Sequence, residues 1–309
     1  MLSILTEPTY PKAALGLEAD SITAIALQKA GRGSFGVKQA ATVELPNKLL
    51  VPNFLERNIA SREEFRVLLE DAVASAGLLN QKNWSVSLPS STARTAILSL
   101  DTATSDKGEI EDVLDWKAEQ TFGAPAAELR ITRNRIADDR QGKSRFFATA
   151  VKLTVIDEYE TVFESLGWKA GLILPRPVSE SRWLSGEVGE DSLLVSSQPE
   201  GFTALLMRGN EATVVRSVTC AENERDDEIF RLLMFYRDRF ADASSASVLD
   251  KMLIIGKEMV PARVREISAE ALGQAVRVLG PEDIGLSLPG GLKFDDIAAP
   301  AGLATYGWR

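Results

Sequence analysis

Hydrophobic residues in the first part of the chain alternate with polar ones over short stretches. The apolar run at residues 13–17 and the alternating residues 21–28 and 34–45 predict three strands, with a turn at residues 31–33. Because short connections join these stretches, they predict an antiparallel β-meander.

A helical pattern follows in residues 61–77. Its apolar side chains recur every three or four positions, which places them on one helix face. Ser61 and Glu64 have the spacing of a capping box, and Gly77 is a typical helix stop. The alternating residues 84–88 then predict a fourth strand. The apolar helix face consists of Phe65, Leu68, Leu69, Ala72, Val73 and Ala76.

The same order of elements recurs in the C-terminal part. Residues 192–195, 202–207 and 212–218 predict strands, with a hairpin turn at residues 208–210. A helix and a strand at residues 252–255 complete the repeat. Strand, strand, strand, helix, strand thus occurs twice, which predicts two structurally related halves. The apolar face of this helix consists of Ile229, Leu232, Leu233, Tyr236 and Phe240.

The segment between these two parts has a different composition. Its Arg-rich alternating residues 129–136 and 145–153 are typical of an antiparallel strand pair with one solvent-exposed face. A strand at residues 95–100 and two helices complete it. We therefore expect a small α+β insertion in the first half, with the rigid residues 175–177 leading back to that half.

Charge and hydropathy narrow the classes of partner. The 309 residues include 35 Lys and Arg against 44 Asp and Glu, a formal net charge of −9. This acidity argues against a nucleic acid or an anionic lipid surface as the main partner. No apolar run approaches the roughly 20 residues that span a bilayer, so we expect a cytoplasmic protein without direct membrane insertion.

The absence of histidine and the presence of a single cysteine exclude several kinds of catalytic and metal site. The chain has no histidine, and therefore no Ser/His or Cys/His nucleophile pair and no histidine metal site. Cys220 is the single cysteine and forms neither an internal disulfide nor a cysteine zinc site. We expect no metal centre.

Two glycine motifs have the composition of phosphate-binding loops. Residues 31–36 match G-x-G-x-x-G, and residues 142–144 read Gly-Lys-Ser. A phosphate loop opens a helix whose N-terminus faces the phosphate, whereas a strand is predicted after each of these motifs. We therefore interpret both as hairpin turns.

Acidic clusters and one tryptophan are further candidates for function. The acidic residues within 109–112 and 224–228 lie at predicted helix starts, where carboxylates favour the positive end of the dipole. Their spacing alone leaves a glycosidase pair or a magnesium site open. Trp116 projects away from the apolar face that contains Val113 and Leu114, so it either packs in the core or contacts a partner.

Two similar halves with an α+β insertion in the first resemble the actin-like (ribonuclease H-like) fold, specifically its PilM and FtsA branch. The local sequence favours PilM, because several stretches resemble that family in the right order over nearly the whole chain. The resemblance implies an α/β fold with a first half at 1–94 plus 175–190, an SHS2-like insertion at 95–174 and a second half at 191–309. The stretches that resemble the PilM family are residues 116–120 with Pro125, 148–152, 163–167, 228–236 and 249–256.

Actin-like proteins hold ATP between the halves, and this chain departs from the family at each loop. Where the family reads Asp-Ile-Gly-Ser, the chain has Glu18-Ala19-Asp20-Ser21, so a carboxylate replaces the glycine that lets the backbone approach phosphate. Two like charges about 4 Å apart repel by roughly 4 kcal/mol at an effective dielectric of about 20. The second Asp-x-Gly becomes Ser196-Ser197-Gln198, and the adenosine loop keeps only Gly256. We therefore predict a pseudo-ATPase with no catalytic residue and no cofactor.

The resemblance also implies a function. PilM-like proteins bind the N-terminal cytoplasmic tail of the bitopic membrane protein PilN in a groove beside the insertion, and help to build a type IV pilus or related secretion platform. The corresponding candidate partner-binding residues are Leu88, Arg94 and Trp116. The alternative is a nucleotide-binding actin-like ATPase similar to FtsA or a sugar kinase, and self-association is left open.

Overall fold

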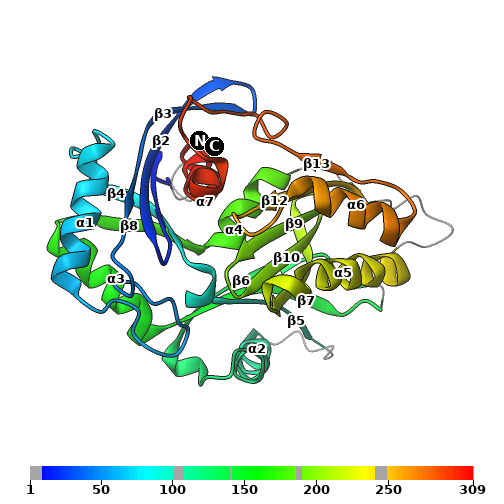
Figure 1. Ribbon diagram of the computed structural model, residues 1–309. Helices are drawn as coiled ribbons and strands as arrows, with labels where there is room; N and C mark the ends of the chain where they lie inside the picture. The colour runs from blue at the N-terminus through cyan, green and yellow to red at the C-terminus, as the bar shows by residue number, and fades with distance from the viewer. Residues whose placement is uncertain (1–8, 101–106, 140, 186–189, 241–248, 309) are drawn as a thin grey trace, which may run out of the picture.

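The computed structural model describes residues 9–100, 107–139, 141–185, 190–240 and 249–308. Its strands form three sheets, two large and one small (Figure 1). The first sheet has the order β14-β3-β2-β1-β4-β8, the second β11-β10-β9-β12-β13 and the third β5-β7-β6. The strands of the first sheet are β1 (Ala13–Leu17), β2 (Ser21–Gly31), β3 (Ser34–Glu44), β4 (Asn83–Leu88), β8 (Lys169–Pro175) and β14 (Leu286–Ser287).

The second sheet repeats the arrangement of the first. Its three antiparallel strands and the parallel strand β12 occur in the same chain order as β1, β2, β3 and β4, which confirms the predicted repeat. These strands are β9 (Asp191–Gln198), β10 (Gly201–Arg208), β11 (Glu211–Thr219), β12 (Leu249–Ile255) and β13 (Arg277–Leu279).

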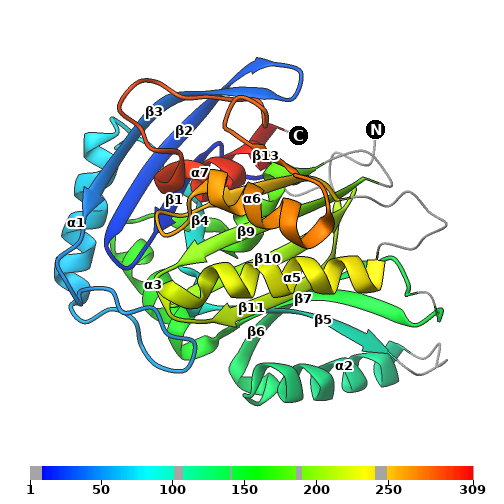
Figure 2. The ribbon, with the colours of Figure 1, turned by 45° about the vertical axis from the view of Figure 1, so that its right-hand side comes forward.

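Pairs of helices cover the outer faces of the large sheets. Figures 1 and 2 show α1 (Arg62–Ser75) and α3 (Leu153–Ser165) on the first sheet, and α5 (Arg225–Phe240) and α6 (Pro261–Leu272) on the second. The predicted apolar faces of α1 and α5 supply the cores beneath them. The side chain of Phe240 lies outside the described residues.

Two further helices lie between the large sheets. They are α4 (Arg176–Ser181) and α7 (Phe294–Ala304), and apolar residues of both sheets pack against α7. A Cβ added at Gly16 of β1 would lie 2.9 Å from the Pro300 ring, so a glycine is needed for α7 to pack this closely. Residues 286–304 therefore contact both halves. The predicted start of the second half at residue 191 stays a prediction.

The small sheet and α2 (Lys107–Phe122) form the inserted unit, whereas α3, the second helix predicted for it, packs on the first sheet instead. Leu114 and Ala118 of α2 are buried against the sheet, as the helical spacing predicts, Ile110 and Val113 of the same predicted face are partly buried, and Phe122 is buried as well. The strands are β5 (Arg94–Leu100), β6 (Leu129–Ile136) and β7 (Ser144–Lys152). Both glycine motifs are hairpin connections, because β2 pairs with β3 and β6 with β7.

Among the described helices, none is both long and apolar enough to cross a membrane.

Candidate functional site

Two hairpin turns, one from each half, border a small cavity between the halves. We call this cavity the hairpin pocket. Its volume is about 100 Å³, whereas sites for small molecules usually measure roughly 300–1,000 Å³. The pocket taken by itself is therefore smaller than a usual small-molecule site. Its lining consists of Glu18, Ala19, Pro52, Pro89, Ser90, Ser91, Gln198, Pro199 and Glu200.

The turn between β1 and β2 carries the first set of predicted site residues. Ser21 Oγ donates to Asp20 Oδ1 at 3.0 Å, and Glu18 Oε2 lies 3.4 Å from a guanidinium nitrogen of Arg176. Arg176 also donates from Nε to Glu180 Oε1 at 2.7 Å. Two carboxylates thus share one buried guanidinium.

This arrangement changes the acidity of Glu18. Burial, followed by the nearby carboxylates of Glu180 and Asp20, raises the pKa of Glu18 to about 7, although Arg176 lowers it. The side chain keeps 30% of its surface exposed, so solvent still reaches it. When it is ionised, the Glu18 carboxylate repels a phosphate group and is stabilised by a nearby cation.

The corresponding turn of the second half is tied down by Arg225. This buried guanidinium donates to the carbonyl oxygens of Gln198, Pro199 and Glu258 at 3.0–3.1 Å. Ser197 Oγ donates to Glu258 Oε2 at 2.9 Å. Ser196 and Gln198 lie at the end of β9, so the carbonyl groups there face a protein cation.

The third loop follows β12 and crosses to the other half. Gly256 has φ +125°, and a Cβ there would lie 2.6 Å from that of Ser197, so only a glycine fits. Lys257 Nζ lies 3.5 Å from Asp20 Oδ2 and 3.3 Å from Asp296 Oδ1. A lysine of the chain itself thus lies between the loops that would hold a nucleotide in this fold.

The donor set does not fit Mg-ATP. The first loop carries the carboxylates of Glu18 and Asp20, and the cations Lys257 and Arg225 are bound to groups of the chain itself. Within the described residues, no group of three or more Asp, Glu or Cys side chains is placed to hold a metal ion. The acidic clusters at the starts of α2 and α5 are therefore consistent with helix-end charges.

A second, wider cavity lies where the insertion meets the second half. We call it the wide groove; its volume is about 640 Å³. Residues 51–55, the start of β5, the end of α2 and the ends of β9, β10 and β11 line it. Arg94 lies in it, with its guanidinium 4.3 Å from the centre of the Phe54 ring and bonded to the Phe122 carbonyl.

A third cavity lies between the first sheet and the insertion. We call it the apolar groove; its volume is about 80 Å³. Thr132 is exposed at its rim, and Leu88 lines its floor. The full lining is Leu88, Ala93, Arg130, Thr132, Thr149, Val151, Ile156, Ile173, Leu174 and Pro175.

The three predicted partner-binding residues therefore lie in different places. Leu88 lines the apolar groove, Arg94 lines the wide groove, and Trp116 lines neither. Trp116 is 59% exposed on α2, so the alternative that it packs in the core is wrong. Its contact with a partner stays a prediction.

The sequence reasoning missed the residues that hold these loops together. Arg176 was interpreted only as part of a rigid Pro-Arg-Pro connection, yet an arginine between two prolines at a strand end was a usable signal. Buried Asn58 was also missed. Its Oδ1 accepts from Thr92 Oγ1 at 2.8 Å and Tyr159 OH at 3.0 Å, while Glu158 accepts from its backbone.

The architecture matches solved structures of one fold. A PilM–PilN type IV pilus biogenesis complex matches with a TM-score of 0.75 and 14% identity, covering 98% of this chain and 100% of that chain. A Bacteroides thetaiotaomicron protein with an actin-like ATPase fold matches with a TM-score of 0.53 and 11% identity, covering 99% of both chains. The chain has the actin-like fold. No protein-family model and no curated protein matches it.

Proposed function

We propose that this chain is a non-enzymatic scaffold of a type IV pilus or related secretion platform, which binds the N-terminal cytoplasmic tail of a PilN-like membrane protein. It would act at the cytoplasmic side of the inner membrane and be held there by this partner. The observation that carries the proposal is the apolar groove beside the insertion, on a fold similar over its whole length to the PilM–PilN complex.

The chemistry of the apolar groove suits an extended peptide with small apolar side chains. Leu88 and Leu174 come from the first sheet, whereas Val151 comes from the insertion, so a peptide there would contact both units. Burying apolar side chains supplies affinity, and the threonine hydroxyls at the rim supply polar contacts. The side of the groove formed by Arg130 carries a guanidinium bound to Glu160.

A pseudo-ATPase fits the loops better than the alternative ATPase. A nucleotide would have to displace Lys257 from Asp20 and overcome the charge of Glu18. Each repulsive contact of about 4 kcal/mol lowers affinity by roughly a thousandfold. These contacts support a scaffold that works without binding or hydrolysing a nucleotide.

The location of the tail is tested by two matched substitutions. Thr132→Trp fills the apolar groove and Thr121→Trp fills the wide groove; both threonines are exposed. The probe is a synthetic peptide of the N-terminal cytoplasmic tail of a PilN-like membrane protein. We expect T132W to weaken its binding at least tenfold and T121W to leave it unchanged. Wild-type affinity in T132W would contradict the proposed location.

A further inference from the structure

The hairpin pocket has an excess of negative charge. Among its lining residues Glu18 and Glu200 are acidic, and none is basic. Glu18 has to share the charge of Arg176 with Glu180, so one guanidinium faces two carboxylates. The pocket therefore lacks one or two positive charges.

Two neutral polar side chains of the pocket also carry an atom without a hydrogen-bond partner. Gln198 Oε1 and Ser90 Oγ are both buried, and neither has a hydrogen-bond partner among the described residues. An amide oxygen only accepts hydrogen bonds, and a hydroxyl oxygen accepts as well as donates. A ligand rich in N–H donors would satisfy these atoms, and buried polar atoms rarely stay without partners.

Apart from Arg176, three cations on nearby elements are engaged with other groups of the chain. Lys257 pairs with Asp20 and Asp296, and Arg225 donates to three carbonyl oxygens. Arg94 lines the far part of the wide groove, where its guanidinium lies over Phe54. None of these cations lines the hairpin pocket.

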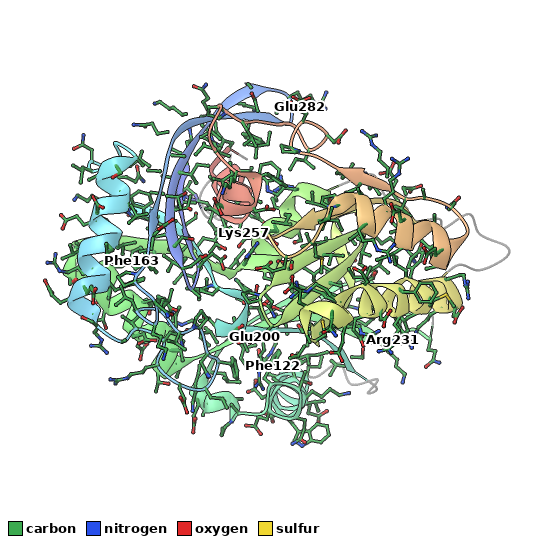
Figure 3. The ribbon with its side chains drawn as sticks, in the orientation of Figure 1. Phe122, Phe163, Glu200, Arg231, Lys257 and Glu282 are labelled. Atoms are coloured by element: carbon green, nitrogen blue, oxygen red, sulfur yellow. The ribbon has the colours of Figure 1, made fainter. Side chains whose placement is uncertain are left out.

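The hairpin pocket is continuous with the wide groove. Both cavities are lined by Pro52, Ser90, Ser91, Gln198 and Glu200, and Figure 3 labels Glu200 of the second half and Phe122 of the insertion in the same region of that view. Whatever enters the pocket by this route passes along the wide groove. The pocket thus forms one end of a longer site.

The wide groove has features that suit a peptide. Val51 and Leu55 at its rim are 50% and 48% exposed, and they would be covered by apolar side chains. β5 and β11 both contribute to its lining, and each is an edge strand of its sheet. These two edges lie next to each other, so a peptide in the groove would contact side chains of both strands instead of extending either sheet.

We propose that the hairpin pocket binds the side chain of an arginine or lysine from an extended peptide that lies in the wide groove. Segments flanking the membrane spans of inner-membrane proteins are rich in lysine and arginine on the cytoplasmic side, and this chain has a net charge of −9. This inference goes beyond the proposed function, because it concerns a different groove.

The test compares two capped heptapeptides by fluorescence anisotropy. One is acetyl-TVTRVTV-amide, and the other has neutral citrulline in place of arginine; free agmatine is the third probe. The protein variants are Glu200→Gln and the matched control Glu282→Gln, which is exposed and lies outside both cavities. Glu200 lies in an exposed turn, so the variant is expected to fold.

We expect the wild type and E282Q to bind the arginine peptide at least tenfold more tightly than the citrulline peptide, and E200Q to lose most of this preference. Added salt should weaken the binding of the arginine peptide more than the binding of the citrulline peptide. Equal affinities for the two peptides, or no binding of the arginine peptide at millimolar concentration, would overturn the proposal. Agmatine binding as tightly as the peptide would show that the pocket takes a free cation instead of a peptide side chain.

Discussion

Lys257 Nζ lies 3.5 Å from Asp20 Oδ2 and joins the two halves of the chain. Asp20 belongs to the β1–β2 turn of the first half, and Lys257 follows β12 of the second. Asp296 at the start of α7 contacts the same ammonium group at 3.3 Å. The gap between the halves is thus bridged by charges of the chain itself.

This ion pair should contribute little to stability. The side chains of Lys257 and Asp20 are 52% and 69% exposed, and exposed pairs contribute roughly 0.2–1 kcal/mol. A double-mutant cycle with Lys257→Gln and Asp20→Asn, measured by urea unfolding, should give a coupling energy in that range. The coupling should shrink further at high salt, and a value above about 2 kcal/mol would show that the pair is shielded from water.

Replacing Asn58 by alanine should be far more costly. The substitution leaves the buried hydroxyls of Thr92 and Tyr159 without their acceptor, and each unsatisfied buried group costs about 1–3 kcal/mol. We expect the free energy of unfolding to fall by about 2 kcal/mol or more in urea titrations. Exposed Asn80→Ala is the control and should change it by less than about 0.5 kcal/mol.

Glu18→Gln should flatten the dependence of stability on pH. The pKa of Glu18 is about 7 in the folded protein against an ordinary 4.5, so the folded state holds this proton more tightly than the unfolded state. Its contribution is therefore full below about pH 4.5 and is lost as the pH rises through about 7. Between about pH 5 and about pH 7.5, the wild type should lose about 1–2 kcal/mol more than E18Q. An equal loss in the two proteins would mean that Glu18 titrates normally; E282Q serves as the charge-matched control.

Trp116→Ala should leave the folded protein almost unchanged. The side chain is 59% exposed, and surface substitutions usually alter stability by less than about 0.5 kcal/mol. If Trp116 contacts a partner, the same variant should weaken that binding by about 2 kcal/mol, as at aromatic hot spots. A fall of several degrees in melting temperature with normal partner binding would argue against the contact role.

Local patterns were enough to predict the order of strands and helix that the two halves share, but not that α3 packs on the first sheet. The capping pair Ser61 and Glu64 and the apolar face of α1 act over one helix, and the Ser61 hydroxyl indeed accepts from the Glu64 backbone. In the same way, helical spacing showed that Trp116 points away from the apolar face of α2. Whether a neighbour covers it depends on tertiary packing, which spacing does not contain.

The contacts that characterise the site join residues far apart in the chain. Arg176 reaches Glu18 across 158 positions, and Lys257 reaches Asp20 across 237. The resemblance to PilM indicated that the three loops meet, because they occupy equivalent strand ends in the two halves. It gave no information on which cations fill the space between them, since the family pattern describes the phosphate-binding residues that this chain lacks.

The most direct test of the proposed scaffold is a calorimetric titration of the partner-tail peptide with and without millimolar Mg-ATP. We expect a dissociation constant of about 10 μM or lower, and the same value when Mg-ATP is present. The protein alone should give no heat with Mg-ATP. Absence of tail binding, or tail binding that appears only with Mg-ATP, would contradict a nucleotide-independent scaffold.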